Sequence, residues 1–172
     1  MNIKNFFFDR DGIINVDTSY PYQKSEIKFI DQSIKFLKYL TFRKKKIFII
    51  TNQSGINRGY YSTKDFLSLN TFFEDYFKKQ SIKIYKTYYC PHLQEENCIC
   101  RKPNNGLIKK ALKEFNLRPH DSVMIGDQLS DVYAGIKSGF KLNFLVSRKK
   151  NIIFNDGRIL VIKNVDEIRN FL

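Results

Sequence analysis

The sequence lacks an apolar run long enough to span a bilayer. Its N-terminal apolar stretch reaches Asp9 after a few residues, and no small-residue cleavage site of a signal peptide follows it. Internal repeats, low-complexity segments and linkers are also missing. We therefore expect one cytoplasmic domain that spans residues 1–172 and has no membrane partner.

Acidic residues are few beside basic ones, 17 against 30, and the formal net charge is +13. Such a balance occurs in nucleic-acid-binding proteins. The basic residues are spread along the chain, however, with only short runs such as 43–46 and 148–150. A lysine-rich composition and an anionic small-molecule substrate explain the charge without a nucleic-acid partner, and we favour that interpretation. No apolar stripe calls for a second subunit, so we expect a monomer.

Cysteine is scarce too: the chain has three, all between positions 90 and 100. A secreted disulfide framework spreads an even number of cysteines along the chain, so this pattern excludes one. Cys90 pairs with His92, and Cys98 with Cys100, each two residues apart. Such neighbours point to the same side of an extended chain and can chelate one ion. Three thiolates and one imidazole predict a closed, structural Zn²⁺ site with no position left for water.

Segments rich in β-branched and aromatic residues alternate with helical patterns. The predicted strands are 3–8, 47–50, 82–89, 122–125, 142–146 and about 159–162. The predicted helices are 31–44 with Asp31 as N-cap, 63–80 after Ser62, 107–115, about 130–138, and a short one at the end. This alternation predicts an α/β fold of three layers, α/β/α, with a central parallel sheet.

Polar residues follow the predicted strands, at the sheet edge where ligands bind in such folds. Asp9-Arg10-Asp11-Gly12 follows the first strand, and Asp127 follows the fourth. Their carboxylates can surround a hard cation such as Mg²⁺. Thr51-Asn52-Gln53-Ser54-Gly55, after the second strand, offers hydrogen-bond donors for phosphate oxygens. Lys102, before the third helix, can neutralise phosphate charge.

In this order, Asp-x-Asp-Gly, Thr-Asn, Lys-Pro and Gly-Asp resemble the haloacid dehalogenase (HAD) superfamily, which includes many phosphatases. The resemblance runs from Phe8 to about Gly139. It implies a phosphatase with a HAD-like fold that requires Mg²⁺. Because only about twenty residues separate Asp11 from the first predicted helix, we expect no large cap domain and an open pocket shaped by loops.

The resemblance also implies roles for individual residues. Asp9 is the expected nucleophile and becomes an aspartyl phosphate, while Asp11 is the expected general acid and base. Thr51 and Lys102 are expected to hold the transferring phosphoryl oxygens. The implied Mg²⁺ ligands are Asp9, Asp11, Asp127 and the backbone carbonyl of Arg10, with Asp131 as support.

Two HAD subfamilies combine these motifs with a Cys-x-His…Cys-x-Cys loop. One removes the 7-phosphate of D-glycero-D-manno-heptose 1,7-bisphosphate in nucleotide-heptose biosynthesis, and the other hydrolyses histidinol phosphate. Asn15, Ser54 and Arg58-Gly59 resemble the first, whereas the short spacing between His92 and Cys98 and the residue Gln128 depart from it. We favour the sugar phosphate and keep histidinol phosphate as the alternative. A basic zinc-containing nucleic-acid-binding protein is the alternative from a different class.

By resemblance to the heptose subfamily, the sugar and its second phosphate would be held by a set of polar residues. Two of these are arginines, whose planar guanidinium groups suit phosphate oxygens. The candidate substrate-binding residues are Asp17, Tyr20, Asn52, Gln53, Ser54, Arg58 and Arg101.

Overall fold

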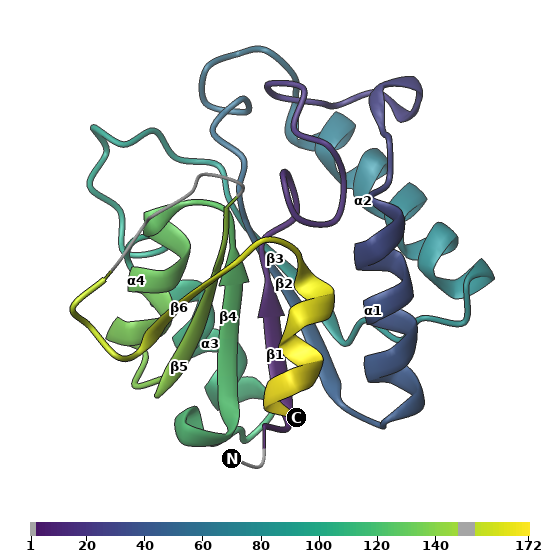
Figure 1. Cartoon of the computed structure of the whole chain (residues 1–172). Helices are drawn as coiled ribbons and strands as arrows, with labels where there is room; N and C mark the ends of the chain where they lie inside the picture. The colour runs from purple at the N-terminus through teal and green to yellow at the C-terminus, as the bar shows by residue number, and fades with distance from the viewer. Residues whose placement is uncertain (1–2, 148–153) are drawn as a thin grey trace.

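The computed structural model describes residues 3–147 and 154–172, so the basic run at 148–150 lies outside the described residues. Its centre is a six-stranded parallel sheet with the strand order β3-β2-β1-β4-β5-β6 (Figure 1). The strands are β1 (Asn5–Phe8), β2 (Lys46–Asn52), β3 (Lys86–Cys90), β4 (Ser122–Gly126), β5 (Leu142–Val146) and β6 (Ile159–Ile162). The predicted fold class is confirmed.

Helices cover both faces of the sheet. The α-helices are α1 (Asp31–Phe42), α2 (Thr63–Lys79), α3 (Gly106–Glu114) and α4 (Leu129–Lys137), and three short 3₁₀ helices are η1 (Lys24–Glu26), η2 (Pro119–Asp121) and η3 (Val165–Phe171). Because side chains alternate along a strand, Phe6 and Phe8 pack against α1, α2 and η3, while Phe7 packs against α3 and α4. β1 is therefore buried on both faces, as its continuous apolar sequence predicts.

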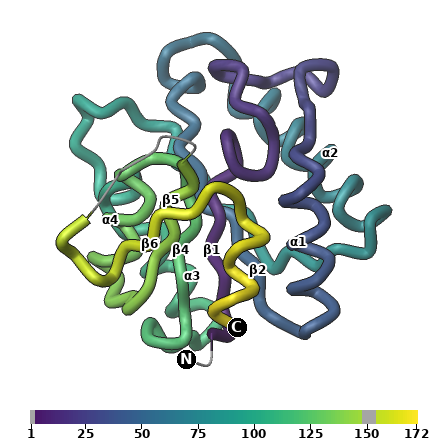
Figure 2. The backbone as a smooth tube through the Cα atoms, viewed as in Figure 1, coloured from purple at the N-terminus to yellow at the C-terminus, as the bar shows by residue number. Residues whose placement is uncertain are grey.

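The sheet brings the predicted functional residues to one edge. Phe8 pairs with Ile49 of β2 on one side and with Ile125 of β4 on the other. Because the strands are parallel and in this register, the segments that follow β1, β2 and β4 leave the sheet side by side. Figure 2 shows the loops after β1 and β2 together beyond this end of the sheet.

Three local predictions need correction. Ile30, not Asp31, is the N-cap of α1, and Asp31 is the first helical residue, where its carboxylate favours the positive end of the helix. The strand predicted at 82–89 pairs with β2 only from Lys86, because the segment before it is still approaching the sheet from α2. The final helix is a 3₁₀ helix.

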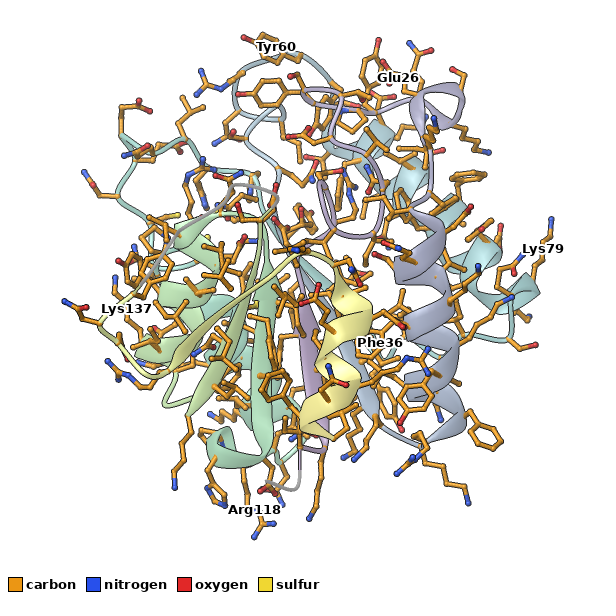
Figure 3. The ribbon with its side chains drawn as sticks, in the orientation of Figure 1. Glu26, Phe36, Tyr60, Lys79, Arg118 and Lys137 are labelled. Atoms are coloured by element: carbon orange, nitrogen blue, oxygen red, sulfur yellow. The ribbon has the colours of Figure 1, made fainter. Side chains whose placement is uncertain are left out.

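The surface carries basic side chains on several sides. In Figure 3, Lys79, Arg118 and Lys137 project away from the body of the molecule in three different directions. None of the helices among the described residues has the length and apolar character needed to cross a membrane.

The start of α2 offers a test of the local sequence signal. Ser62 accepts a hydrogen bond from the Asp65 backbone N–H at 3.1 Å, and the Asp65 carboxylate accepts one from the Ser62 backbone N–H at 2.9 Å. This reciprocal capping box satisfies two N–H groups that the helix cannot bond internally.

We predict that Ser62→Ala lowers the free energy of unfolding by about 1 kcal/mol, measured by urea denaturation, because the cap is lost. Ser68→Ala in the exposed middle of α2 is the matched control, since alanine is the better helix former there. Equal stability of the Ser62→Ala protein and the wild type would contradict the prediction.

Candidate active site

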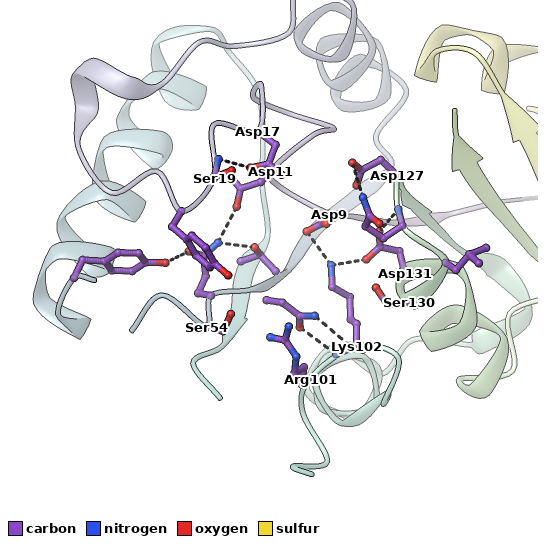
Figure 4. Close-up of a pocket in the computed structure, with 17 residues that line it drawn as sticks. Asp9, Asp11, Asp17, Ser19, Ser54, Arg101, Lys102, Asp127, Ser130 and Asp131 are labelled. Carbon is purple, nitrogen blue, oxygen red and sulfur yellow. Dashed lines mark hydrogen bonds and ion pairs between the residues drawn. The ribbon is translucent and has the colours of Figure 1, made fainter. Parts of the chain in front are cut away.

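A cavity of about 590 Å³ opens at the carboxyl edge of the sheet (Figure 4). Residues that follow β1, β2 and β4 line it, together with the segment before α3. They include eleven of the site residues predicted from the sequence, which are Asp9, Asp11, Asp17, Tyr20, Thr51, Asn52, Gln53, Ser54, Arg101, Lys102 and Asp127. The structure thus gathers most of the predicted site in one pocket.

Lys102 is the central cation of the pocket. Its side chain is 1% exposed, and its Nζ lies 2.8 Å from Asp9 Oδ1 and 2.7 Å from Asp131 Oδ1. It also donates a hydrogen bond to the Ile50 carbonyl at 2.7 Å. In Figure 4 the ammonium group lies between the two carboxylates. Burial lowers the pKa of Lys102, but Asp131 and Asp9 outweigh burial and raise it, so the lysine is positively charged.

The backbone of Lys102 is held from β2. Asn52 Nδ2 donates to the Lys102 carbonyl at 3.2 Å, and the Lys102 N–H donates to Asn52 Oδ1 at 3.1 Å. Both ends of the Asn52 amide are therefore committed to the protein. Asn52 thus positions the lysine, and its predicted contact with the substrate stays a prediction.

One of the two carboxylate oxygens of Asp9 remains available for reaction. Its Oδ1 accepts the Arg10 backbone N–H at 2.7 Å and lies against Lys102, and the side chain is 13% exposed. Burial raises the pKa of Asp9 to about 8 in the absence of a metal ion, and the neighbouring Asp131 adds to the effect while Lys102 opposes it. An additional cation beside Asp9 would favour its ionised form.

Asp9, Asp127 and Asp131 form a candidate site for that cation. Each offers an oxygen, and these oxygens lie within 4.8 Å of one another. Asp131 Oδ1 is buried with the Lys102 ammonium group as its partner, and burial and Asp131 raise the pKa of Asp127. Gly12 passes so close that a Cβ there would lie 2.3 Å from Asp127 Oδ2. Carboxylate oxygens are the ligands that Mg²⁺ prefers, so this donor set fits it.

The other two predicted Mg²⁺ ligands already have partners. The Arg10 carbonyl accepts hydrogen bonds from the backbone N–H groups of Ile14 at 2.7 Å and Asn15 at 3.3 Å. The Asp11 carboxylate is turned toward the Arg10 guanidinium, which donates to Oδ1 at 3.1 Å and to Oδ2 at 3.0 Å. Asn15 Nδ2 also donates to Asp11 Oδ1 at 2.9 Å. Asp11 therefore lies beside the cluster of Asp9, Asp127 and Asp131 and is not part of it.

The Arg10 side chain is a part of the site that the sequence did not reveal. It is 1% exposed, and its guanidinium lies over the rings of Phe66 at 5.7 Å and Phe73 at 5.2 Å, both in α2. A buried arginine needs such an ion pair and aromatic contacts. We predicted only its backbone as functional, because nothing in the sequence shows where the side chain points.

The rim of the pocket carries aromatic and basic groups. Tyr20 lines the cavity, and its ring packs edge-on against Tyr60 with centroids 5.1 Å apart. The Arg58 guanidinium lies 5.9 Å from the Tyr20 ring centroid, outside the residues that line the cavity. Arg101 does line it and donates to the His92 carbonyl at 3.1 Å. Of the two arginines predicted to bind phosphate, Arg101 thus lines the cavity and Arg58 lies outside its lining.

The four predicted zinc ligands come together beside the pocket. His92 Nδ1 lies 3.1 Å from Cys100 Sγ and 3.5 Å from Cys90 Sγ, and Cys98 Sγ lies 3.3 Å from Cys100 Sγ. All three cysteines are free thiols. Burial raises the pKa of Cys90, whereas hydrogen bonds, the Arg101 N–H first among them, outweigh burial at Cys98 and lower its pKa to about 7. The set suits a tetrahedral metal ion.

Comparisons with known proteins agree with this site. Residues 99–148 match the family model for HAD-hydrolase-like proteins. The chain is 43% identical over 172 residues to the D-glycero-alpha-D-manno-heptose-1,7-bisphosphate 7-phosphatase of Campylobacter jejuni, covering 99% of this chain and 96% of that protein. It is 44% identical over 144 residues to the D-glycero-beta-D-manno-heptose-1,7-bisphosphate 7-phosphatase of Helicobacter pylori, covering 83% of each.

Solved structures share the fold. A HAD-like phosphatase from Mesorhizobium loti superposes with a TM-score of 0.88 at 27% identity, covering 98% of this chain and 84% of that one. The D,D-heptose 1,7-bisphosphate phosphatase from B. bronchiseptica, complexed with magnesium and phosphate, superposes with a TM-score of 0.81 at 22% identity, covering 92% of each chain.

Sheet topology, pocket and sequence matches thus agree on the class: this is a HAD-type phosphatase, a phosphoric monoester hydrolase. The identity extends over nearly the whole length of relatives that carry one name. The chain belongs to the family of the D-glycero-D-manno-heptose-1,7-bisphosphate 7-phosphatases.

We predict that Mg²⁺ stabilises the protein more at pH 8 than at pH 5.5, measured as the rise in Tm on adding saturating MgCl₂. The folded-state pKa of Asp9, about 8, lies above its unfolded value, so without metal the folded protein retains a proton that the unfolded chain releases. Metal-free stability therefore falls as pH rises from about 4 to about 8. Mg²⁺ binds the deprotonated carboxylates and reverses the loss. An equal rise at both pH values would contradict the prediction.

Proposed function

We propose that the protein hydrolyses the 7-phosphate of D-glycero-D-manno-heptose 1,7-bisphosphate through an aspartyl phosphate on Asp9, with Mg²⁺. The product, a heptose 1-phosphate, would enter nucleotide-heptose biosynthesis in the cytoplasm. The observation that carries this proposal is the buried Lys102–Asp9 pair at the base of an open pocket, in a chain 43% identical to a named heptose bisphosphatase.

Asp9 suits the nucleophile by its hydrogen bonds. Because the Arg10 N–H and Lys102 both engage Oδ1, Oδ2 is the oxygen that can attack phosphorus. The new Oδ2–P bond forms as the bond from phosphorus to the sugar oxygen breaks. Lys102 offsets the negative charge of the phosphoryl group as it approaches the carboxylate, and the Thr51 hydroxyl is placed to donate to a phosphoryl oxygen.

Asp11 is the proposed acid and base for the two proton transfers. In its protonated form Asp11 gives its proton to the departing sugar oxygen, and the carboxylate that results then takes a proton from the water that cleaves the aspartyl phosphate. Its carboxylate lines the same cavity as Asp9, and its side chain is 18% exposed. Water and the leaving oxygen can therefore reach it from the pocket.

We assign the Mg²⁺ to Asp9 and Asp127, with Asp131 supporting the site through Lys102. When bound, the ion neutralises charge on the phosphoryl group and on the carboxylates. Asp11 and the Arg10 carbonyl stay predictions as further ligands, since each is hydrogen-bonded within the protein here.

The rest of the substrate is proposed to lie along the rim. Asp17, Ser54 and Tyr20 line the cavity and offer hydrogen-bonding groups for sugar hydroxyls. Arg101, within the cavity, and Arg58, above Tyr20, are the groups for the second phosphate. A single chain supplies all these groups, so we propose a monomer, with no nucleic-acid partner.

We further propose that the Cys90, His92, Cys98 and Cys100 cluster binds a structural Zn²⁺. Its role follows from the contacts of the loop. The Arg101 N–H donates to Cys98 Sγ at 3.3 Å, and Asn104 Nδ2 donates to the Cys98 carbonyl at 2.8 Å. Fixing Cys98 therefore fixes the segment that carries Arg101 and Lys102.

We predict that Cys98→Ser abolishes stoichiometric zinc, measured by elemental analysis of the purified protein, and lowers kcat/KM about tenfold or more, because the catalytic lysine loses its support. Glu95→Gln, on the exposed part of the same loop, is the control and should retain zinc. Wild-type protein without zinc would reject the assignment.

We predict that Asp9→Asn abolishes phosphate release from the heptose bisphosphate, a loss of at least about 10⁴-fold in kcat, because the amide cannot form the aspartyl phosphate. Asp75→Asn on the exposed face of α2 is the matched control and should keep wild-type activity. Retained turnover by the Asp9→Asn protein would reject the nucleophile.

The substrate is tested by phosphate release from heptose 1,7-bisphosphate and histidinol phosphate at matched concentrations with Mg²⁺. We expect kcat/KM to favour the bisphosphate by at least about 100-fold, because only it uses the two rim arginines. A preference for histidinol phosphate would show that the short zinc loop was the better guide. Release from neither, with salt-dependent DNA binding, would favour the binding-protein alternative.

A further inference from the structure

Gln53 occupies an unexpected place in the pocket. It follows β2, is 3% exposed, and lies between Asp11 and Thr51. The sequence suggested a substrate contact, but its side chain bonds only protein groups among the described residues. We propose that Gln53 is a positioning residue that sets the orientation of both Asp11 and Thr51, and that the Tyr61 hydroxyl holds Gln53 in place. The inference rests on the proposed function, which makes Asp11 the proton donor.

The hydrogen bonds account for every polar atom of the Gln53 side chain. An amide nitrogen has two hydrogens; here Nε2 donates one to Asp11 Oδ2 at 2.9 Å and one to Thr51 Oγ1 at 2.8 Å. Oε1 accepts the Tyr61 hydroxyl at 2.7 Å. A carboxylate only accepts, so Asp11 requires the nitrogen end of the amide to face it. No Gln53 hydrogen is left over for a substrate.

This arrangement determines what Thr51 can do. Because Thr51 Oγ1 accepts a hydrogen bond from Gln53, its own hydrogen must point elsewhere. Thr51 is 1% exposed and lines the cavity beside Asp9, so that hydrogen is available to a phosphoryl oxygen. Gln53 thereby links the group that donates to the phosphoryl oxygen with the group that protonates the leaving oxygen.

Asp11 depends on Gln53 at one of its two oxygens. Oδ1 accepts from Arg10 and Asn15, whereas Oδ2 accepts from Arg10 and Gln53. Without the Gln53 amide, Asp11 Oδ2 keeps only the charged Arg10 as a donor. The remaining hydrogen bonds then draw the carboxylate toward Arg10. The carboxylate would then lie away from the departing sugar oxygen.

Tyr61 is held so that its hydroxyl reaches Gln53. It is 6% exposed, and its ring stacks on Tyr22 with centroids 5.5 Å apart and an interplanar angle of 14°. The ring also abuts Gly55, where a Cβ would lie 2.3 Å from a ring carbon. Burial raises the pKa of Tyr61 to about 12, which keeps the hydroxyl protonated as a donor.

The test combines Tyr61→Phe and Gln53→Leu, alone and together, in the full-length enzyme with Mg²⁺. The measured quantity is kcat/KM for heptose 1,7-bisphosphate, which reports phosphoryl transfer to Asp9 and not the later hydrolysis. Because general acid catalysis contributes ~10²–10⁴-fold, we expect a loss of about 10- to 100-fold for Gln53→Leu and about 5- to 10-fold for Tyr61→Phe. If Tyr61 acts through Gln53, the double variant loses no more than Gln53→Leu alone.

A second substrate separates positioning from general damage. p-Nitrophenyl phosphate has a leaving group that departs without a proton, so misplacing Asp11 matters less. We expect each variant to lose at least about fivefold less kcat/KM on this substrate than on the sugar phosphate. Tyr22→Phe, which removes a hydroxyl from the ring stacked on Tyr61 without touching Gln53, should change either value less than about twofold. Thermal unfolding checks that every variant is folded.

Additive losses in the double variant, or equal losses on the two substrates, would overturn the positioning role. A rise in KM for the sugar phosphate with unchanged kcat would instead make Gln53 a substrate contact. If the wild type hydrolyses p-nitrophenyl phosphate but not the heptose bisphosphate, the proposed substrate fails. The coupling of Tyr61 and Gln53 is then measured on histidinol phosphate, another alkyl phosphate, with the same criteria.

Discussion

The pocket depends on the interactions of one buried group, the ammonium group of Lys102. A lysine that is 1% exposed loses its hydration, which is costly unless anions and hydrogen-bond acceptors replace the water. Asp9, Asp131 and the Ile50 carbonyl do so, and they come from three different parts of the chain. The ends of β1, β2 and β4 must therefore stay in register for the charge to remain buried. Removing one partner would leave an uncompensated charge in the centre of the molecule.

The same electrostatics favours the binding of a divalent cation at this site. Around Lys102 lie three carboxylates, Asp9, Asp127 and Asp131, so one cation faces three potential anions. Burial and the charge of Asp131 raise the pKa values of Asp9 and Asp127, whereas the proposed nucleophile must be deprotonated. A divalent cation corrects the charge balance and, in the same place, attracts the phosphate. In the proposed mechanism, the stability of the site and the binding of the substrate thus both depend on this divalent cation.

The sequence predicts the fold and the position of the site because both depend on patterns along the chain. Alternating apolar strands and amphipathic helices specify a parallel sheet, and any polar group directly after a strand must then lie at its carboxyl edge. Asp9, Thr51 and Asp127 were located in this way. The candidate zinc ligands between Cys90 and Cys100 were predicted from local spacing alone. The limits of β3 and the N-cap of α1 depended on how each segment approaches the sheet, which tertiary packing decides.

Side-chain direction could not be predicted in the same way. Asn52 and Gln53 are polar residues at a strand end, and that position alone is equally suited to binding a substrate or a neighbouring loop. The structure shows both amides bonded to protein groups, Asn52 to Lys102 and Gln53 to Asp11, Thr51 and Tyr61. The Arg10 and Tyr61 side chains were not predicted, because contacts such as Arg10 with Phe66 and Tyr61 with Tyr22 join residues far apart in the sequence. Such long-range pairs leave no periodic signal in one chain.

These amide contacts also explain how a pocket formed by loops can hold reacting groups in place. Catalysis by charge neutralisation requires groups that are already oriented before the substrate arrives. Here two of the proposed reacting side chains are held from the end of β2: Lys102 by Asn52, and Asp11 by Gln53, the residue after the strand. Beside the pocket, the cysteine cluster holds the segment that carries Arg101. Asn57, in the loop after β2, donates a hydrogen bond to Glu96 beside that cluster at 3.0 Å. The loops therefore support one another. The end of β2, where Asn52 bonds Lys102 and the next residue, Gln53, bonds Asp11, sets the relative position of these two side chains.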